Sequence, residues 1–337
     1  MFNFHQNHKQ LFITALGVYV ILSVVIAVMP ASQMQRAKPL PGQPALTDLE
    51  LKGLNTFVAE NCMSCHTQQV RNIEMDKTWG ERPSMPSDYY FSKQKPDIWR
   101  QSASLLGSER TGPDLTNAGR RQPDQAWHLL HFFNPRIVVK ESIMPAYPWL
   151  FEEKDAAAVT KQDVVVPVPA SFLEDKNQKV VATKKVLNLI AYIQTLKQAP
   201  LPDNSTLNFI SSTRENDEQR TASENGIPIA DGQKLYTQHC AACHQPNGKG
   251  LPGAFPALDG SPVVNEPDPD FLVRVILQGY DARSEFAQMP GFATQLTDEE
   301  ISAIINHERS SWGNEAPAVS SEQVANIRSK VMEEVNQ

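Results

Sequence analysis

The sequence has few cysteines and no excess of basic residues. Its 337 residues include four cysteines, and 31 Lys and Arg are outnumbered by 38 Asp and Glu, which gives a net charge of −7. Because the balance is acidic, the chain lacks the electrostatic footprint of a nucleic-acid-binding protein, and we expect no nucleic-acid partner. The acidic residues are scattered, as on a solvated surface. The length fits about two domains and a tail.

One apolar run lies near the N-terminus. Residues 11–29 contain no charged residue, and this length fits a single membrane-spanning helix. A cleaved signal peptide is the alternative, but its apolar region is shorter, and no A-x-A cleavage pattern follows this run. Lys9 lies before the run and Arg36 and Lys38 lie after it, so the flanking charges do not decide its orientation. We expect a retained anchor that contacts membrane lipid.

All four cysteines lie in two copies of one pattern, CMSCH at residues 62–66 and CAACH at residues 240–244. C-x-x-C-H is typical of covalent attachment of c-type haem, in which two thiols bond to the porphyrin and the adjacent imidazole ligates the iron. A four-cysteine zinc site and a thioredoxin-like redox pair are the alternatives, but both leave the two histidines as coincidence. The pattern predicts two covalently bound haem c groups, attached through Cys62, Cys65, Cys240 and Cys243.

The stretches that follow the two motifs share a plan. Residues 113–115 and the pair Met144-Pro145 in the first copy correspond to residues 256–258 and Met289-Pro290 in the second. The first copy has a longer insertion between its motif and its Pro-x-Leu segment. We therefore predict a mainly α-helical chain with two copies of one domain. The predicted boundaries are 1–30 for a cytoplasmic N-terminus and anchor, 31–197 for the first domain, 198–228 for a linker, 229–314 for the second domain and 315–337 for a tail.

Each haem iron needs a ligand on both faces to be closed to other chemistry. We expect His66 and His244 on one face, oriented by the backbone carbonyls of Pro113 and Pro256. Met144 and Met289 are the candidates for the other face, because a thioether is a soft, neutral ligand that raises the reduction potential. An adjacent proline limits the backbone freedom of each methionine. Core packing is the ordinary role of a lone methionine, but here both precede proline at matching places in the repeat.

Other residues could serve the haems. His128 and His131 lie three positions apart on a predicted short helix, but no nearby cysteine or carboxylate completes a metal site, so we expect structural or propionate-facing roles. Four arginines are either solvated or paired with haem propionates: Arg71, Arg110, Arg120 and Arg136. The long irregular segment after His66 contains scattered aromatic residues, which favours a packed loop with a docking role: Trp79, Tyr89, Tyr90, Phe91 and Trp99.

Beyond its CMSCH motif, the first half has a specific run of residues: Arg71, 110–115, Trp127, His128, His131, 134–136 and 141–150. With this run, residues 47–196 and the anchor resemble the membrane-anchored monohaem subunit (subunit II) of cbb3-type cytochrome c oxidases. The resemblance implies that His66 and Met144 are an axial pair. Residues 229–313 resemble a class I cytochrome c domain, through residues 235–236, 250–253 and 310–314, and the implied axial pair is His244 and Met289.

The resemblance implies a mainly α chain with one N-terminal transmembrane helix and two class I cytochrome c domains. It also implies a non-catalytic, dihaem electron-transfer subunit of a cbb3-type haem–copper cytochrome c oxidase. Its expected partners are the haem–copper catalytic subunit, other oxidase subunits, and a soluble cytochrome or quinol-oxidising complex as donor. Since haem c is attached outside the bacterial inner membrane, we expect a single-pass protein with its haem domains in the periplasm.

The sequence leaves other functions open. A usual subunit II ends after its first haem domain, so the second domain either replaces part of the dihaem oxidase subunit or is a built-in electron donor. The alternative complexes are a related nitric oxide reductase and a periplasmic dehydrogenase with a cytochrome subunit. A dihaem peroxidase is an enzyme of another class, and it would require one iron to lose its methionine ligand.

Overall fold

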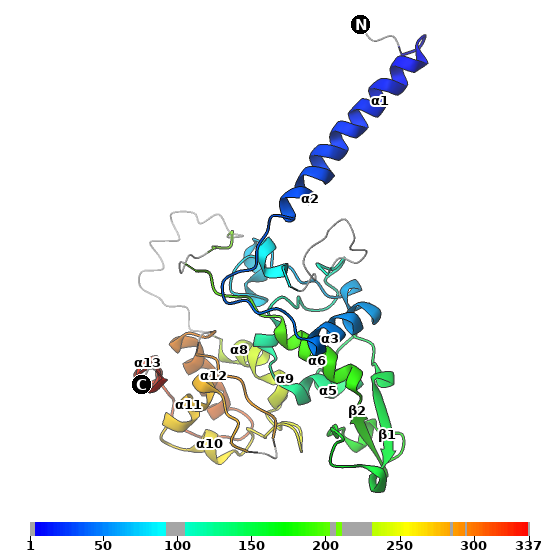
Figure 1. The fold of residues 1–337 in the computed structure, drawn as a ribbon. Coiled ribbons are helices and arrows are strands. Elements are labelled where there is room, and N and C mark those ends of the chain that lie inside the picture. The colour runs from blue at the N-terminus through cyan, green and yellow to red at the C-terminus, as the bar shows by residue number, and fades with distance from the viewer. Residues whose placement is uncertain are drawn as a thin grey trace. The chain divides into compact units, whose positions relative to one another are not determined.

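The computed structural model describes residues 4–91, 105–202, 207–210, 231–283, 286–293 and 295–335. Trp99 and most of the predicted linker lie outside these ranges. The described chain is mostly helical (Figure 1), which confirms the predicted fold class. It divides into two compact units, residues 1–117 with 195–212 and residues 118–194 with 213–337. We describe each unit by itself, and the predicted domain boundaries remain a prediction.

The N-terminal helix is the candidate anchor. The helix α1 (His8–Ser23), a π-helical turn (Val24–Val28) and α2 (Met29–Met34) follow one another without a break (Figure 1). The helix His8–Gln33 contains an 18-residue window with a mean hydropathy of 2.7, and none of that window is buried. A helix satisfies its own backbone hydrogen bonds, so it can cross lipid with apolar side chains facing outward. Among the described residues this helix is the one long and apolar enough to span a membrane.

The first unit also contains α3 (Asp48–Ala59), which leads into the first haem motif. Thr47 and Glu50 form a capping box, because the Thr47 backbone N–H donates to the Glu50 carboxylate at 2.6 Å and the Thr47 hydroxyl accepts from the Glu50 backbone at 3.4 Å. Leu54 and Phe57 are buried on one face. Asn61 then adopts a left-handed conformation with φ of 56°, and a 3₁₀ turn (Cys62–Ser64) begins the motif.

The described part of the segment after His66 is packed through short 3₁₀ turns at Glu74–Thr78 and Pro86–Tyr89. Tyr89 is buried, and the neighbouring Arg82 and Asp88 form a buried ion pair at 2.6 Å. The docking role of this segment remains a prediction.

The second unit begins with α4 (Ala118–Arg121) and α5 (Gln125–Phe133) and later contains α6 (Lys184–Thr195). Between them an antiparallel hairpin pairs β1 (Phe151–Asp155) with β2 (Gln178–Ala182), in the register Phe151 to Ala182. The sequence analysis did not predict this hairpin. The apolar face of α6 is buried, and it comprises Val186, Leu189, Ile190, Ile193 and, just after the helix, Leu196.

The rest of the second unit is a helical module around one core. Its elements are α8 (Gly232–His239), α9 (Ala241–His244), α10 (Pro262–Asn265), α11 (Asp270–Gln278), α12 (Asp298–Ser310) and α13 (Ser321–Val335). The helix α8 crosses α12 closely, because Gly232 lies against the backbone carbonyl of Ala303 and a Cβ there would clash. Tyr236, one turn later, is fully buried in this core.

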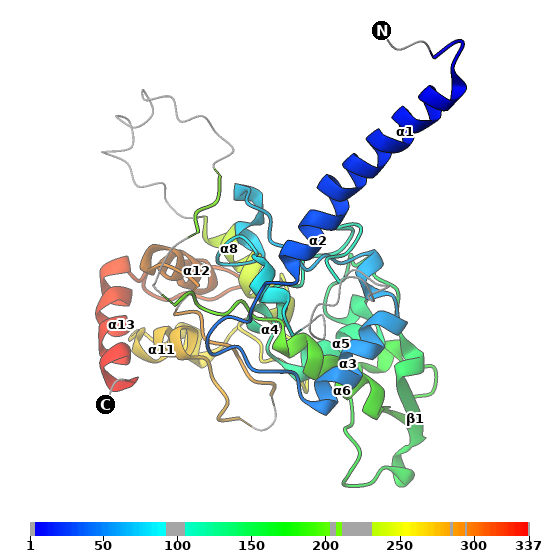
Figure 2. The ribbon, with the colours of Figure 1, turned by 45° about the horizontal axis from the view of Figure 1, so that its top comes forward.

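The C-terminal segment 315–337, for which the sequence predicts a tail, contains the packed helix α13. Val324, Ile327 and Val331 recur on one face and are buried in the same core. The helix α13 lies beside α11 and α12 (Figure 2). It therefore belongs to the module that contains the second haem motif.

Candidate haem sites

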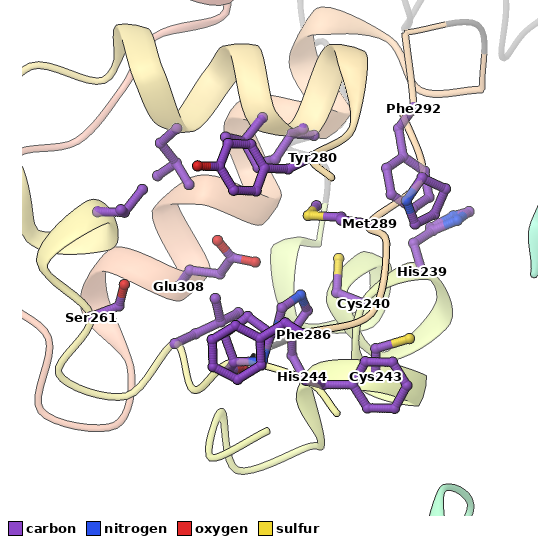
Figure 3. Close-up of a pocket in the computed structure, with 18 of the residues that line it drawn as sticks. His239, Cys240, Cys243, His244, Ser261, Tyr280, Phe286, Met289, Phe292 and Glu308 are labelled. Carbon is purple, nitrogen blue, oxygen red and sulfur yellow. Dashed lines mark hydrogen bonds between the residues drawn. The ribbon is translucent and has the colours of Figure 1, made fainter. Parts of the chain in front are cut away.

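The second motif lines a deep pocket in the second unit (Figure 3). The helix α8 ends at His239 with Cys240 as its C-cap, and the single turn α9 brings Cys243 and His244 to the same wall. The Nδ1 of His244 lies 3.0 Å from the backbone carbonyl of Pro256. Since a carbonyl can only accept, Nδ1 carries the proton, and Nε2 is left with the lone pair that a metal needs.

Met289 reaches the same pocket from another segment. The backbone N–H of Tyr280 donates to the carbonyl of Met289 at 3.0 Å, and the backbone N–H of Met289 donates to the carbonyl of Tyr280 at 2.9 Å. Figure 3 shows the Met289 sulfur and the His244 ring directed into the pocket. The structure thus brings together all four residues predicted for this site, Cys240, Cys243, His244 and Met289.

The pocket walls fit a large apolar macrocycle. They come mainly from α11, α12 and the stretch around Met289, which is described at residues 286–293 and 295–297 and which we call the Met289 segment. The apolar lining includes Leu272, Val275, Ile276, Phe286, Phe292, Leu296 and Ile304. Burial raises the pKa of the Cys243 thiol to about 12 and also raises the pKa of the Cys240 thiol, whereas a reactive redox pair has a lowered thiol pKa. Among the described residues, no group of three His, Cys, Asp or Glu is placed to hold a metal ion. The apolar lining of the pocket is the observation that favours a covalently attached haem.

Glu308 is a pocket residue that the sequence analysis missed. It follows Ile301, Ile304 and Ile305 at helical spacing, so it lies on the apolar face of α12. Burial raises the pKa of this carboxyl to about 8, which keeps it protonated at neutral pH. The sequence does contain a signal for Glu308, because its helical spacing from three apolar isoleucines places its carboxyl on the face that becomes buried.

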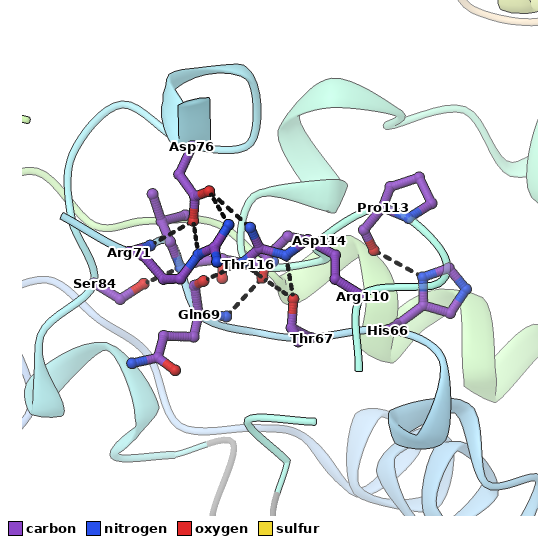
Figure 4. Close-up of polar contacts among 11 residues, drawn as sticks. His66, Thr67, Gln69, Arg71, Asp76, Ser84, Arg110, Pro113, Asp114 and Thr116 are labelled. Carbon is purple, nitrogen blue, oxygen red and sulfur yellow. Dashed lines mark hydrogen bonds and ion pairs between the residues drawn. The ribbon is translucent and has the colours of Figure 1, made fainter. Parts of the chain in front are cut away.

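The first motif lies in the first unit. The Nδ1 of His66 lies 2.8 Å from the backbone carbonyl of Pro113 (Figure 4), so the ring is oriented as His244 is. Gly112 lies against this ring. A Cβ on Gly112 would come within 2.7 Å of Nδ1 and 2.9 Å of Nε2 of His66. The backbone N–H of Gly112 also donates to the carbonyl of Cys65 at 2.8 Å.

Met144, the predicted partner of His66, belongs to the second unit. The guanidinium of Arg136 donates to the backbone carbonyl of Met144 at 2.9 Å. The backbone N–H of Tyr147 donates to the carbonyl of Phe132 at 2.9 Å, which attaches the segment to α5. Arg136, predicted to be solvated or propionate-bound, therefore holds the Met144 backbone. Axial pairing of His66 with Met144 remains a prediction.

A buried polar cluster supports the loop of His66 (Figure 4). We call it the Asp76 cluster, and it comprises Thr67, Arg71, Asp76, Arg110 and Asp114. Asp76 and Asp114 are fully buried. Arg71 and Arg110 bind Asp76 at 2.9 and 2.7 Å. Asp114 follows Pro113 directly and accepts from the Thr67 hydroxyl at 2.6 Å. The sequence leaves the two arginines either solvated or on haem propionates. In the structure both bind the buried Asp76, and the Arg71 side chain is also 51% exposed.

We predict that Asp76→Asn lowers the free energy of unfolding by roughly 3 kcal/mol, because breaking a buried ion pair leaves charges uncompensated. Burial works to raise the Asp76 pKa, but hydrogen bonds from Arg71 and Arg110 lower it to about 2. This carboxylate therefore stabilises the fold above about pH 4 and loses that contribution as the pH falls towards 2. Denaturant titrations from pH 7 to pH 2 should show a shallower acid dependence in the variant.

Asp163→Asn is the matched control, since Asp163 also binds a cation, Lys154, at 2.7 Å in the hairpin region. Solvent screens such a pair, so the loss should be much smaller. Equal losses in the two variants would contradict a structural role for the Asp76 cluster.

The two histidines of α5 have structural roles. The Nε2 of His128 donates to the backbone carbonyl of Gln122 at 2.8 Å, and burial lowers its pKa to about 4. The His131 ring stacks on Trp127 with centroids 4.5 Å apart. Such contacts correspond to the structural role, one of the two roles expected for this pair.

Comparisons with known proteins match both halves of the chain. The family model "Cytochrome C oxidase, mono-heme subunit/FixO" matches residues 3–183, and the model "Cytochrome C oxidase, cbb3-type, subunit III" matches residues 228–307.

Three relatives illustrate the range. Cytochrome c-552 of Thermus thermophilus is 44% identical over 94 residues, which is 25% of this chain and 70% of that protein. The cytochrome c subunit of the quinone alcohol dehydrogenase of Gluconobacter oxydans (strain 621H) is 36% identical over 103 residues, 29% of this chain and 22% of that protein. The fructose dehydrogenase cytochrome subunit of Gluconobacter japonicus is 28% identical over 88% of this chain and 68% of that protein.

These matches agree with the helical fold, with the candidate anchor and with the haem c motif in each half of the chain. The chain belongs to the FixO family of mono-haem cytochrome c oxidase subunits and carries a C-terminal cbb3-type cytochrome c domain, which makes it an electron-transfer subunit of a cbb3-type oxidase.

Proposed function

We propose that this subunit carries two covalently attached haem c groups and relays electrons between them. The C-terminal haem, bound by His244 and Met289, accepts an electron from a donor cytochrome or a quinol-oxidising complex. It passes the electron to the haem bound by His66 and Met144, which delivers it to the haem–copper subunit. Both haem modules lie on the periplasmic side of the inner membrane, and the helix His8–Gln33 anchors them.

One observation carries this proposal. In each motif the histidine Nδ1 is occupied by a backbone carbonyl, at 2.8 Å for His66 and 3.0 Å for His244. Both rings thus present Nε2, which is the orientation that axial ligation requires. When bound, a haem supplies a one-electron couple, and the protein supplies the covalent attachment, the ring orientation and an apolar, water-poor pocket.

The experiment is purification of the chain in mild detergent, with identification of the proteins that accompany it. We expect a large membrane subunit that contains copper, and oxygen uptake that depends on this chain. Non-haem iron in place of copper would favour a nitric oxide reductase. A flavin or quinone dehydrogenase with no haem–copper subunit would overturn the proposal.

The dehydrogenase alternative has a specific observation in its favour, because the fructose dehydrogenase cytochrome subunit aligns over 88% of this chain. The match of the FixO model to residues 3–183 argues against it. The two functions differ in the direction of electron flow at the membrane. A dehydrogenase subunit would receive electrons from a sugar or alcohol, and adding such substrates to the purified complex should reduce no haem if our proposal holds.

A further inference from the structure

We infer that Arg328 on α13 is a positioning residue for the Met289 ligand of the C-terminal haem. This inference rests on the proposed ligation of that haem by Met289. It assigns a role to the C-terminal helix, which lies beyond the matched cbb3-type region at residues 228–307.

The guanidinium of Arg328 binds three groups that follow Met289 in the chain. Its Nε donates to the carboxylate of Asp298 at 2.7 Å, its Nη1 to the backbone carbonyl of Ala293 and its Nη2 to the backbone carbonyl of Leu296 at 2.9 Å. One planar side chain thus joins α13 to the segment after Met289 and to the first turn of α12. An arginine is suited to this because its donors are held in a fixed fork.

The helix α13 is itself firmly held, so Arg328 is a fixed point. Val324 and Val331 lie about one turn on either side of Arg328 and are buried in the core that Met289 and Ala293 pack against. At the far end of α13, Glu334 binds Arg274 of α11 at 2.8 Å. That second ion pair touches no residue of the Met289 segment.

The opposite edge of the Met289 segment is bound to α11. The backbone N–H groups of Phe292 and Ala293 donate to the carbonyls of Ile276 and Leu277 at 2.8 and 3.2 Å. The segment is therefore held between α11 on one edge and Arg328 on the other. Phe292 and Leu296 line the haem pocket, so movement of this segment would disturb both the methionine and the pocket wall.

This arrangement matters because the iron–thioether bond competes with stronger ligands from solution. A ligand that is already held in place loses less conformational entropy when it binds. Without Arg328, two backbone carbonyls and a carboxylate lose charged donors, and the segment gains freedom to move away from the iron. An outside ligand would then replace the methionine more easily.

The test is a titration of the oxidised, full-length holoprotein with imidazole. The readout is the sulfur-to-iron charge-transfer band, which ferric haem shows when methionine sulfur is bound. The variants are Arg328→Gln and the control Arg274→Gln, which removes the ion pairs of Arg274 and leaves the Met289 segment untouched. Our proposal gives each of the two haems such a band, so the band of the first haem serves as an internal reference.

We expect Arg328→Gln to lose half of the band of the C-terminal haem at an imidazole concentration about tenfold lower than wild type. The loss of a hydrogen bond from a charged group changes such an equilibrium by about that factor. Arg274→Gln should titrate as wild type does. Arg328→Lys, which keeps the charge but not the fork, should fall between them. Thermal unfolding of all variants separates loss of the ligand from loss of the fold.

Two results would overturn the inference. An imidazole titration of Arg328→Gln that matches wild type would show that Met289 does not depend on Arg328. An equal shift in Arg274→Gln would show a general effect of loosening α13. If Met289→Leu leaves the wild-type band unchanged, the proposed Met289 ligation fails instead, so the two failures are distinguishable.

Discussion

Replacing Met144 or Met289 with leucine should lower the reduction potential of one haem and leave the other unchanged. Axial ligands set haem potentials over a range of roughly 0.8 V, and thioether sulfur favours the reduced iron. We therefore expect each single variant to shift one of two potentiometric steps downward by an appreciable part of that range. A spectroelectrochemical titration of the purified protein measures both steps. The ferrous variants should also bind carbon monoxide at one haem, while the wild type binds none.

Met75→Leu is the matched control, because Met75 is 74% exposed and lies outside both predicted ligand sets. It should leave both steps and the carbon monoxide behaviour unchanged. Carbon monoxide binding by the wild-type protein would contradict closed coordination at both irons and would favour a peroxidase. A variant of Met144 that shifts neither step would remove Met144 from the site, which matters because the structure places Met144 and His66 in separate units.

Gly112→Ala should disrupt the first haem site selectively. A Cβ at this position would lie 2.7 Å from Nδ1 of His66, which is too close for any relaxed packing. The ring would have to move, and its hydrogen bond to the Pro113 carbonyl would break. We expect overpacking to lower stability by roughly 1–3 kcal/mol and to weaken the bond from His66 to iron. Electron paramagnetic resonance of the oxidised protein should show one altered haem signal and one unchanged.

Gly119→Ala separates ligand displacement from general strain. A Cβ on Gly119 would meet the backbone of Gln194, with its Cα at 2.8 Å, so the variant is also overpacked. It touches no predicted ligand, and we expect lower stability with both haem signals unchanged. A Gly112→Ala protein with two wild-type haem signals would contradict the orientation of His66 that we describe.

Local sequence patterns predicted the parts of the site that lie close together in the chain. The C-x-x-C-H motifs place two thiols and an imidazole on one turn whatever the rest of the fold does. The carbonyl acceptors Pro113 and Pro256 were predicted from the repeat, and both hydrogen bonds are present. Thr297 and Glu300 form a capping box at the start of α12, and such a box is readable from the sequence because its two hydrogen bonds need no distant partner.

Contacts between distant segments were harder to predict. The hairpin of β1 and β2 was missed because its strands are short and charged, and the burial pattern of Phe151–Asp155 shows one buried residue. Asp76 was missed because Arg110, one of its partners, lies 34 positions away. The helix α13 has an apolar spacing that the sequence shows, but its packing depends on the faces that α11 and α12 leave available.

The account depends most directly on two covalent haems in one chain. The intact mass of the denatured polypeptide measures this, because thioether-bound haem stays attached when the fold is lost. We predict a mass increased by two haems, with one on the peptide that contains Cys62 and Cys65 and one on the peptide that contains Cys240 and Cys243. A single haem, or an unmodified chain that co-purifies with zinc, would contradict the account.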